Sequence, residues 1–196
     1  MPRHEKHRAA PGLRNSIAAV AARLMAEDGV SDYYHAKKKA ARQLGLPDHV
    51  AFPDNAEVEA ELRAYRELYQ AEEHPAVLRA LRHSALVLLD LLAPFNPYLT
   101  GSVLDGTAGE HSQIDILLFA DSAKEVEIFL LNRGLEVCHG QVRGERVEAV
   151  LQVDTDTVDA NLIVLSPQQE RVIMKHRDGR VRERIKAAEL RRMLEV

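Results

Sequence analysis

The chain has 196 residues, of which 46% are hydrophobic, so it can bury a core and form one or two globular domains. No run of residues approaches the roughly 18 apolar residues of a membrane span, and the charged start "MPRHEKHRAAPG" lacks the apolar region of a secretory signal. The single cysteine excludes an internal disulfide. We therefore expect a cytoplasmic protein without a membrane partner. The net charge of −4 is uneven, at +4 over residues 1–50, −13 over residues 51–170 and +5 over residues 171–196, so the basic ends could meet a polyanion or pack on the acidic middle.

Residues 14–75 are predicted to form a helical N-terminal region, preceded by a charged, disordered tail over residues 1–13. We expect ordered structure to begin near Asn15 or Ser16. Ser31 is the predicted cap of the second helix. Apolar residues at helical spacing predict four helices, over about residues 16–28, 32–44, 56–72 and 75–92.

Residues 76–196 are predicted to form an α+β domain, because the helical period gives way to an extended one after "APFNP". Two strands flank a loop over residues 101–112. Ser122 and Glu125 form an S-x-x-E capping box for the next helix. Three more strands are expected within residues 135–142, 146–153 and 158–165, followed by a hairpin at Asp178-Gly179 and a closing helix over residues 186–194.

Gly101 and Ser102 end the first predicted strand, and twelve residues separate Ser102 from Asp115 on the next strand. A glycine followed by a hydroxyl residue lets the backbone approach a phosphate, with amide groups and the Ser102 hydroxyl as donors. A carboxylate on the adjacent strand would hold Mg²⁺ against the same phosphate oxygens. The spacing therefore indicates two parts of a nucleotidyl-transfer site.

The string "TGS", twelve residues, "DILL" resembles the signature of the nucleotidyltransferase superfamily related to DNA polymerase beta. The resemblance covers about residues 76–165 and implies a mixed sheet with packed helices. It implies that Gly101 and Ser102 bind phosphate, that Asp115 is a catalytic residue and the first metal ligand, and that Asp159 in "VDA" is the third carboxylate. A nucleoside triphosphate, as ligand or substrate, and Mg²⁺ would be the bound groups.

The chain departs from this signature at the second carboxylate, where it has Leu117. An apolar side chain cannot bridge two metal ions, so the site is predicted to be degenerate. The loop acids Asp105 and Glu110, together with His111, could replace the missing ligand or serve only the turn and solubility. Asp159 also has a second interpretation, because it clusters with Asp154 and Asp156 at a predicted turn, where aspartate is favoured for its geometry.

The longer strings "GSVLDGTAGEHSQIDILLFAD" and "AARLMAEDGVSDYYHAKKKAARQLGLP" resemble a family of bacterial proteins of about this length. They are labelled nucleotidyltransferase-like or, by automated labelling, UDP-N-acetylmuramate–alanine ligase. The ligase label fails a physical check, because this chain lacks the G-x-x-G-K-[ST] type of phosphate loop and the length for several domains. This second resemblance implies a retained fold with no established activity.

Three functions follow from these patterns, and the sequence leaves open whether the chain is an enzyme. The leading hypothesis is a nucleotidyltransferase-like protein with a degenerate metal site that binds a nucleotide or another phosphorylated ligand and is regulatory. One alternative is an active Mg²⁺-dependent nucleotidyltransferase that transfers a nucleoside monophosphate to an undetermined acceptor. The other is a nucleic-acid-associated or partner-binding protein that uses its basic termini; its N-terminal helices resemble half of a helix-turn-helix without a recognition helix. The nucleotide and the oligomeric state are also left open. The basic residues of the C-terminal hairpin expected to face the anion are Lys175, Arg177, Arg180, Arg182 and Arg184.

Overall fold

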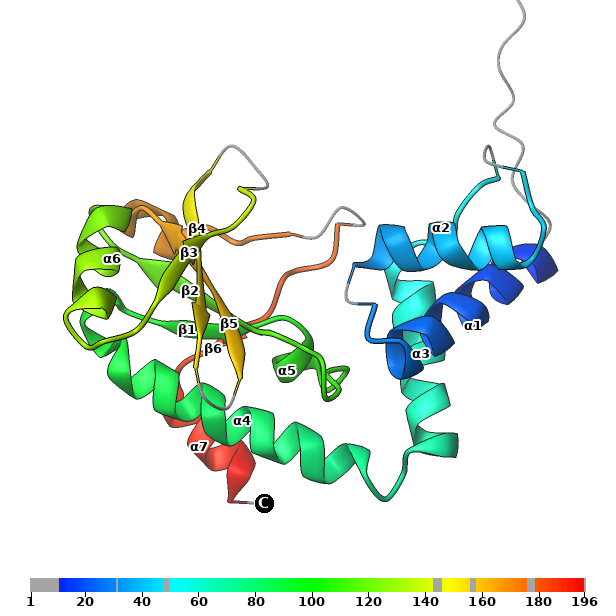
Figure 1. Ribbon diagram of the computed structural model, residues 1–196, viewed down its shortest axis with the longest axis horizontal. Helices are drawn as coiled ribbons and strands as arrows, with labels where there is room; N and C mark the ends of the chain where they lie inside the picture. The colour runs from blue at the N-terminus through cyan, green and yellow to red at the C-terminus, as the bar shows by residue number, and fades with distance from the viewer. Residues whose placement is uncertain are drawn as a thin grey trace, which may run out of the picture. The chain divides into compact units, whose positions relative to one another are not determined.

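A computed structural model describes residues 11–30, 32–47, 50–142, 146–155, 158–175 and 179–195. The chain divides into two compact units, Met1–His74 and Pro75–Val196 (Figure 1). Helix α1 (Pro11–Glu27) begins four residues before the predicted start of order, so residues 11–13 are helical. The rest of the predicted tail, residues 1–10, lies outside the described residues.

The N-terminal unit consists, within its described residues, of α1, α2 (Tyr33–Gln43) and α3 (Asn55–Tyr69). The predicted cap Ser31 lies outside the described residues, and the carboxylate of Asp32 accepts the capping hydrogen bond from His35 N at 2.9 Å. Helix α3 begins with a reciprocal capping box between Asp54 and Glu57. A small core joins the three helices through Ile17, Ala18, Ala21, Leu24, Ala36, Ala40 and Val58.

The C-terminal unit contains the remaining elements. Its helices are α4 (His74–Leu91), α5 (Ser102–Asp105), α6 (Ala123–Leu131) and α7 (Ala187–Leu194), with 3-10 turns η1 (Ala93–Phe95) and η2 (Pro167–Arg171). Its strands are β1 (Tyr98–Thr100), β2 (Ile114–Phe119), β3 (Val137–His139), β4 (Val147–Asp154), β5 (Asp159–Leu165) and β6 (Arg184–Ile185). The short helix α5 lies inside the segment predicted to be a loop, and β6 was not predicted.

Six strands in the described part of the chain form one sheet in the order β3-β4-β5-β2-β1-β6. Strand β2 is parallel to β5, whereas the other neighbouring strands are antiparallel, so the sheet is mixed. The predicted α+β class, with a helical N-terminal region followed by a mixed sheet with packed helices, is confirmed. The predicted turn at Arg143-Gly144 lies outside the described residues, as does Asp178 of the predicted hairpin.

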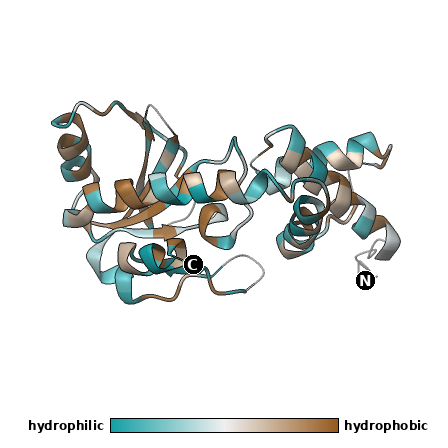
Figure 2. Cartoon of the chain, turned by 90° about the horizontal axis from the view of Figure 1, so that it is seen from below, coloured by the Kyte–Doolittle hydropathy of each residue, from teal (hydrophilic) through white to brown (hydrophobic). Residues whose placement is uncertain are grey.

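Helices cover one face of the sheet. Side chains alternate between the two faces along each strand, so every second residue of a strand points toward these helices. Ile114, Ile116 and Leu118 of β2 pack into the main core together with buried residues of α4, α5, α6 and α7. Helix α7 lies beside α4 (Figure 1), where Arg191 Nη2 contacts both carboxylate oxygens of Asp90 at 2.6 Å. Figure 2 shows the matching pattern, with largely hydrophobic strands and helices that alternate in hydropathy.

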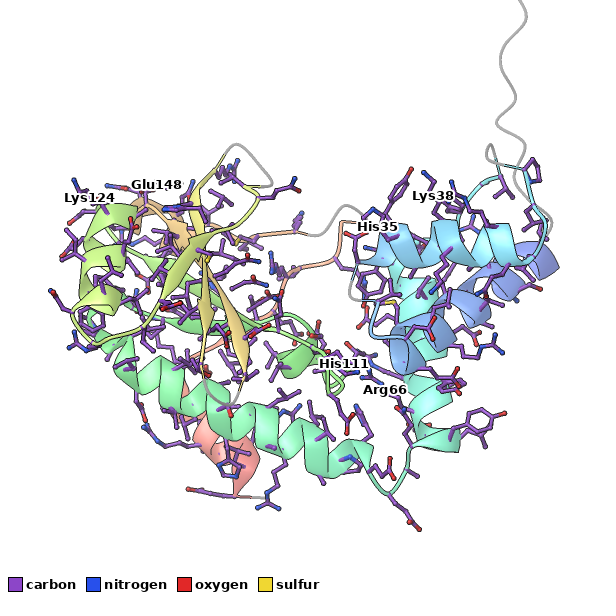
Figure 3. The ribbon with its side chains drawn as sticks, in the orientation of Figure 1. His35, Lys38, Arg66, His111, Lys124 and Glu148 are labelled. Carbon is purple, nitrogen blue, oxygen red and sulfur yellow. The ribbon has the colours of Figure 1, made fainter. Side chains whose placement is uncertain are left out.

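The start of α6 uses a different cap from the predicted box. The Ser122 hydroxyl accepts from Lys124 N at 3.2 Å, and Glu148 Oε1 of β4 accepts from Ala123 N at 2.9 Å. Lys124 and Glu148 accordingly lie close together in Figure 3. A carboxylate from a neighbouring strand thus caps the helix, which ties α6 to β4. None of the helices in the described part of the chain has the length and apolar character needed to span a bilayer.

Candidate functional site

A row of polar residues crosses the sheet on the face opposite the helices. The strand register places Thr100 opposite Asp115, Asp115 opposite Asn161, and Asn161 opposite Gln152. Residues opposite one another in neighbouring strands point to the same face of the sheet. We call Thr100, Asp115, Asn161 and Gln152 the polar row; it contains the carboxylate that the sequence singled out.

Gly101 follows β1 and lies directly against Asp115. Its backbone has φ 76° and ψ −157°, a conformation found almost only in glycine. A Cβ atom at this position would lie 2.6 Å from Asp115 Oδ2 and 3.3 Å from Asp115 Cβ. Glycine is therefore required twice here, for the backbone conformation and for the approach of the carboxylate.

Ser102 begins the single turn of α5, and its backbone organises the loop that follows. Its carbonyl oxygen accepts hydrogen bonds from Thr107 N at 2.9 Å and Ala108 N at 3.0 Å, while Asp105 N donates to Gly101 O at 2.9 Å. The Ser102 side chain is half-buried. The loop thus holds Gly101 and Ser102 together at the end of β1, next to Asp115, as the sequence predicted.

The carboxylate of Asp115 belongs to a hydrogen-bonded chain of side chains. Asn161 Nδ2 donates to Asp115 Oδ1 at 3.0 Å and to Gln113 Oε1 at 3.0 Å. Gln152 Nε2 donates to Asn161 Oδ1 at 3.2 Å, which fits this orientation of the Asn161 amide. Burial raises the pKa of the Asp115 carboxyl above its ordinary value, and the Asn161 hydrogen bond and the charge of Arg182 oppose that rise.

Thr100 connects the polar row to the C-terminal segment. Its side chain is fully buried, and its hydroxyl donates to Glu183 O at 2.8 Å and accepts from Arg182 Nε at 3.2 Å. Arg182 N donates to Met174 O at 2.8 Å, which fixes the backbone of this arginine as well. Arg182 is thereby held within the electrostatic reach of Asp115.

The other basic residues of the predicted anion-facing set differ from Arg182. The Arg184 guanidinium donates to Glu170 O and lies 4.9 Å from the centre of the Tyr98 ring and 5.2 Å from that of Phe119. It therefore fastens η2 to the sheet. Lys175 and Arg180 are exposed, and Arg177 lies outside the described residues.

Leu117, at the position of the family's second carboxylate, is 1% exposed. It packs with Phe119 and Leu165 in an apolar cluster on the same face as the polar row. Partly buried hydrophobic residues complete this cluster, namely Tyr98, Val147, Ile163 and Met174. A metal ion beside Leu117 would meet hydrocarbon instead of oxygen ligands.

Asp159, the predicted third carboxylate, is exposed at the start of β5 and pairs in register with Asp154. Asn161 is the residue of β5 that contacts Asp115, and sequence reasoning missed it. A signal was present, because residues two apart on a strand share a face and the parallel register decides which of them meets Asp115. The side chain contacting Asp115 is consequently an amide donor instead of a carboxylate.

The donor set does not fit a two-metal centre. Within the described ranges, no three His, Cys, Asp or Glu residues gather in a way that could hold a metal ion. The loop candidates Asp105, Glu110 and His111 therefore do not form such a group of three with Asp115. His111 lies in the loop between α5 and β2 (Figure 3). Magnesium binding by Asp115 and Asp159 remains a prediction from the sequence resemblance.

No family model and no curated protein matches the chain. A structure of Cid1, a protein with RNA terminal uridylyl transferase activity, is 19% identical over 44% of this chain and 30% of that chain, with a TM-score of 0.35. A structure of Cid1 with its short product ApU is 18% identical over 52% and 35% of the two chains, also with a TM-score of 0.35. The chain spans about a third of the length of these Cid1 chains.

Proposed function

We propose that the C-terminal unit binds a nucleotide or another phosphorylated ligand at Gly101, Ser102 and the polar row, and that it is a regulatory protein without nucleotidyl transfer. The observation that carries this proposal is the contact between Gly101 and Asp115 at the ends of adjacent strands. The order of helix, strand, Gly-Ser, strand with Asp115 and capped helix also agrees with the nucleotidyltransferase resemblance. Ser102, at the end of the same strand, is partly exposed, and its hydroxyl is a donor for a phosphate oxygen.

The proposal excludes transfer chemistry because, in the part of the chain that the structure describes, no group of three possible metal ligands is assembled around Asp115. Two-metal catalysis uses paired carboxylates to position both ions, whereas Leu117 is apolar and Asn161 is a neutral amide. A single carboxylate held by an amide donor can orient a ligand but cannot hold two cations. The enzyme alternative therefore lacks a supporting observation.

Binding of nucleic acid through the basic ends is also not favoured. In the N-terminal unit, Lys37 Nζ donates to Pro53 O at 3.0 Å and to Asn55 Oδ1 at 2.8 Å, and Lys39 pairs with Asp28 at 2.8 Å. At the other end of the chain, α7 pairs with α4 through an arginine. Several basic residues thus serve contacts within their own units.

Thermal unfolding of the full chain against ATP, CTP, GTP and UTP tests the proposal. At a ligand concentration 100-fold above Kd, mass action stabilises the folded state by about 2.7 kcal/mol, a readily measured rise in Tm. We expect such a rise with at least one nucleotide, and no incorporation or hydrolysis of labelled nucleotide. The absence of a shift with all four would refute the proposal. Turnover that disappears in Asp115→Asn would instead establish the enzyme alternative.

A further inference from the structure

The charge around Asp115 differs from that of a site built to hold divalent cations. A set of three carboxylates requires cations before a phosphate can approach, because like charges repel. Here the second of those positions is Leu117, and the β5 residue in contact with Asp115 is the neutral Asn161. One carboxyl group remains at the centre of the row, and one guanidinium lies near enough to interact with it.

Arg182 is placed to supply that guanidinium. Its Nε donates to Thr100 Oγ1 at 3.2 Å, so one edge of the guanidinium is held by the sheet. Its two terminal nitrogens make no hydrogen bond to protein within the described residues. The fork of an arginine matches two oxygens of a phosphate, and fixing the fork in advance reduces the entropy lost on binding.

The neighbouring cations of the same segment are already used by the fold. Arg184 donates to the carbonyl of Glu170 and packs on aromatic rings. Lys186 lies 4.9 Å from the centre of the Tyr98 ring and 3.9 Å from Glu170 Oε1. Arg184 Nη1 also lacks a hydrogen-bond partner among the described residues, but Arg184 packs on the apolar cluster, whereas Arg182 contacts Thr100 of the polar row.

We propose that this site binds the phosphate groups of a nucleoside triphosphate without a divalent metal, with Arg182 providing the positive charge that metal ions provide in the resembling family. This inference rests on the proposed function, since it names the residue and the charge by which the same ligand is held. Gly101 brings the end of β1 against Asp115, and Thr100 orients the arginine beside it.

Calorimetric titration of the full chain with ATP, CTP, GTP, UTP and inorganic tripolyphosphate tests the inference. Each probe is titrated once in EDTA and once in Mg²⁺. The variants are Arg182→Gln, which removes the charge, and Arg182→Lys, which keeps the charge but loses the fork. Arg192→Gln is the control, because it removes the same charge from an exposed position on α7. The Tm of each unliganded variant verifies that it is folded.

We expect Kd in EDTA to equal that in Mg²⁺ within about threefold. Loss of one or two hydrogen bonds to a charged phosphate corresponds to a rise in Kd of about 10- to 100-fold in Arg182→Gln, a smaller rise in Arg182→Lys, and no change in Arg192→Gln. Binding that disappears in EDTA would overturn the inference and leave the proposed function standing. Unchanged affinity in a folded Arg182→Gln would do the same. Absence of binding with every probe under both conditions would overturn the proposed function itself.

Discussion

Replacing Gly101 by alanine tests whether the contact between the strand end and Asp115 is rigid. The positive φ with extended ψ costs a non-glycine residue about 1–3 kcal/mol. The new Cβ would also lie 2.6 Å from Asp115 Oδ2, so the carboxylate must move and lose its hydrogen bond from Asn161, which costs about 1.5–3 kcal/mol. We therefore expect Gly101→Ala to destabilise the C-terminal unit by about 3–5 kcal/mol.

Gly134→Ala is the control for a positive φ without a steric contact. Gly134 has φ 74°, close to the 76° of Gly101, but a Cβ there would meet nothing within 4 Å. The expected cost is about 1 kcal/mol, from the positive φ alone. In a double mutant with Asp115→Ala, the cost of Gly101→Ala should fall by about 1.5–3 kcal/mol, because the clashing oxygen is gone.

Hydrogen exchange followed by mass spectrometry is the suitable assay, because the chain has two units and a single unfolding free energy is not defined for it. Peptides from β2 and β5 report the opening free energy of the C-terminal unit. Peptides from α1 and α3 are the internal reference and should be unchanged. If Gly101→Ala costs no more than Gly134→Ala, the carboxylate moves freely and the reasoning about a fixed contact is wrong.

Three further predictions concern the carboxylates of the site. Asp115→Asn should stabilise the C-terminal unit increasingly as pH rises, because the pKa of the Asp115 carboxyl is raised in the folded protein. The free-energy cost of ionising this carboxyl is absent below the ordinary aspartate pKa, grows with pH and is complete above the pKa of the folded state. Denaturation at several pH values measures the difference in stability between variant and wild type, and a difference that shrinks as pH rises would contradict the prediction. Leu117→Asp should destabilise the C-terminal unit by more than about 3 kcal/mol, because it puts an unpaired charge into the apolar cluster. Ile128→Asp, at an exposed position of α6, is the control and should cost less than about 1 kcal/mol. Equal losses of hydrogen-exchange protection in the two variants would count against the packing of Leu117 described above. Asn161→Asp should create a carboxylate pair with Asp115 that can bind a metal ion. The Tm of this variant should therefore rise with added Mn²⁺, whereas the Tm of the wild type should not. A Tm of Asn161→Asp that does not respond to Mn²⁺ would show that the two positions are not close enough to share an ion.

Much of the fold could be predicted from local sequence, because periodicity, glycines and capping residues act over a few neighbours. Strand β2 shows this: its apolar residues and its single acid sufficed to place both the strand and Asp115. Strand β6 shows the opposite, since the two residues Arg184 and Ile185 carry no local strand signal and are extended because they pair with β1. Its existence depends on a partner far away in the chain.

The site was predictable only in part for the same reason. Gly101, Ser102 and Asp115 lie within one local motif, and the structure brings them together. Asn161 enters through the register between β2 and β5, which a one-residue shift would change entirely. The sequence could not distinguish the role of Arg182 from that of Arg184, because these roles depend on tertiary contacts. Arg182 contacts Thr100, whereas Arg184 packs on Tyr98.

The pairing of β6 with β1 also determines the order in which parts of the sheet can form while the chain is being synthesised. Arg182 is 82 residues beyond Thr100, an interval that a ribosome takes about 4–16 seconds to translate at 5–20 residues per second. During that interval β1 has an open backbone edge, which can pair with another nascent chain. Strands β1 and β2, with Gly101 and Ser102 at the end of β1, can assemble first, and Arg182 joins them last. A chaperone that shields β1 on the emerging chain would therefore protect both the sheet and the assembly of the proposed anion site.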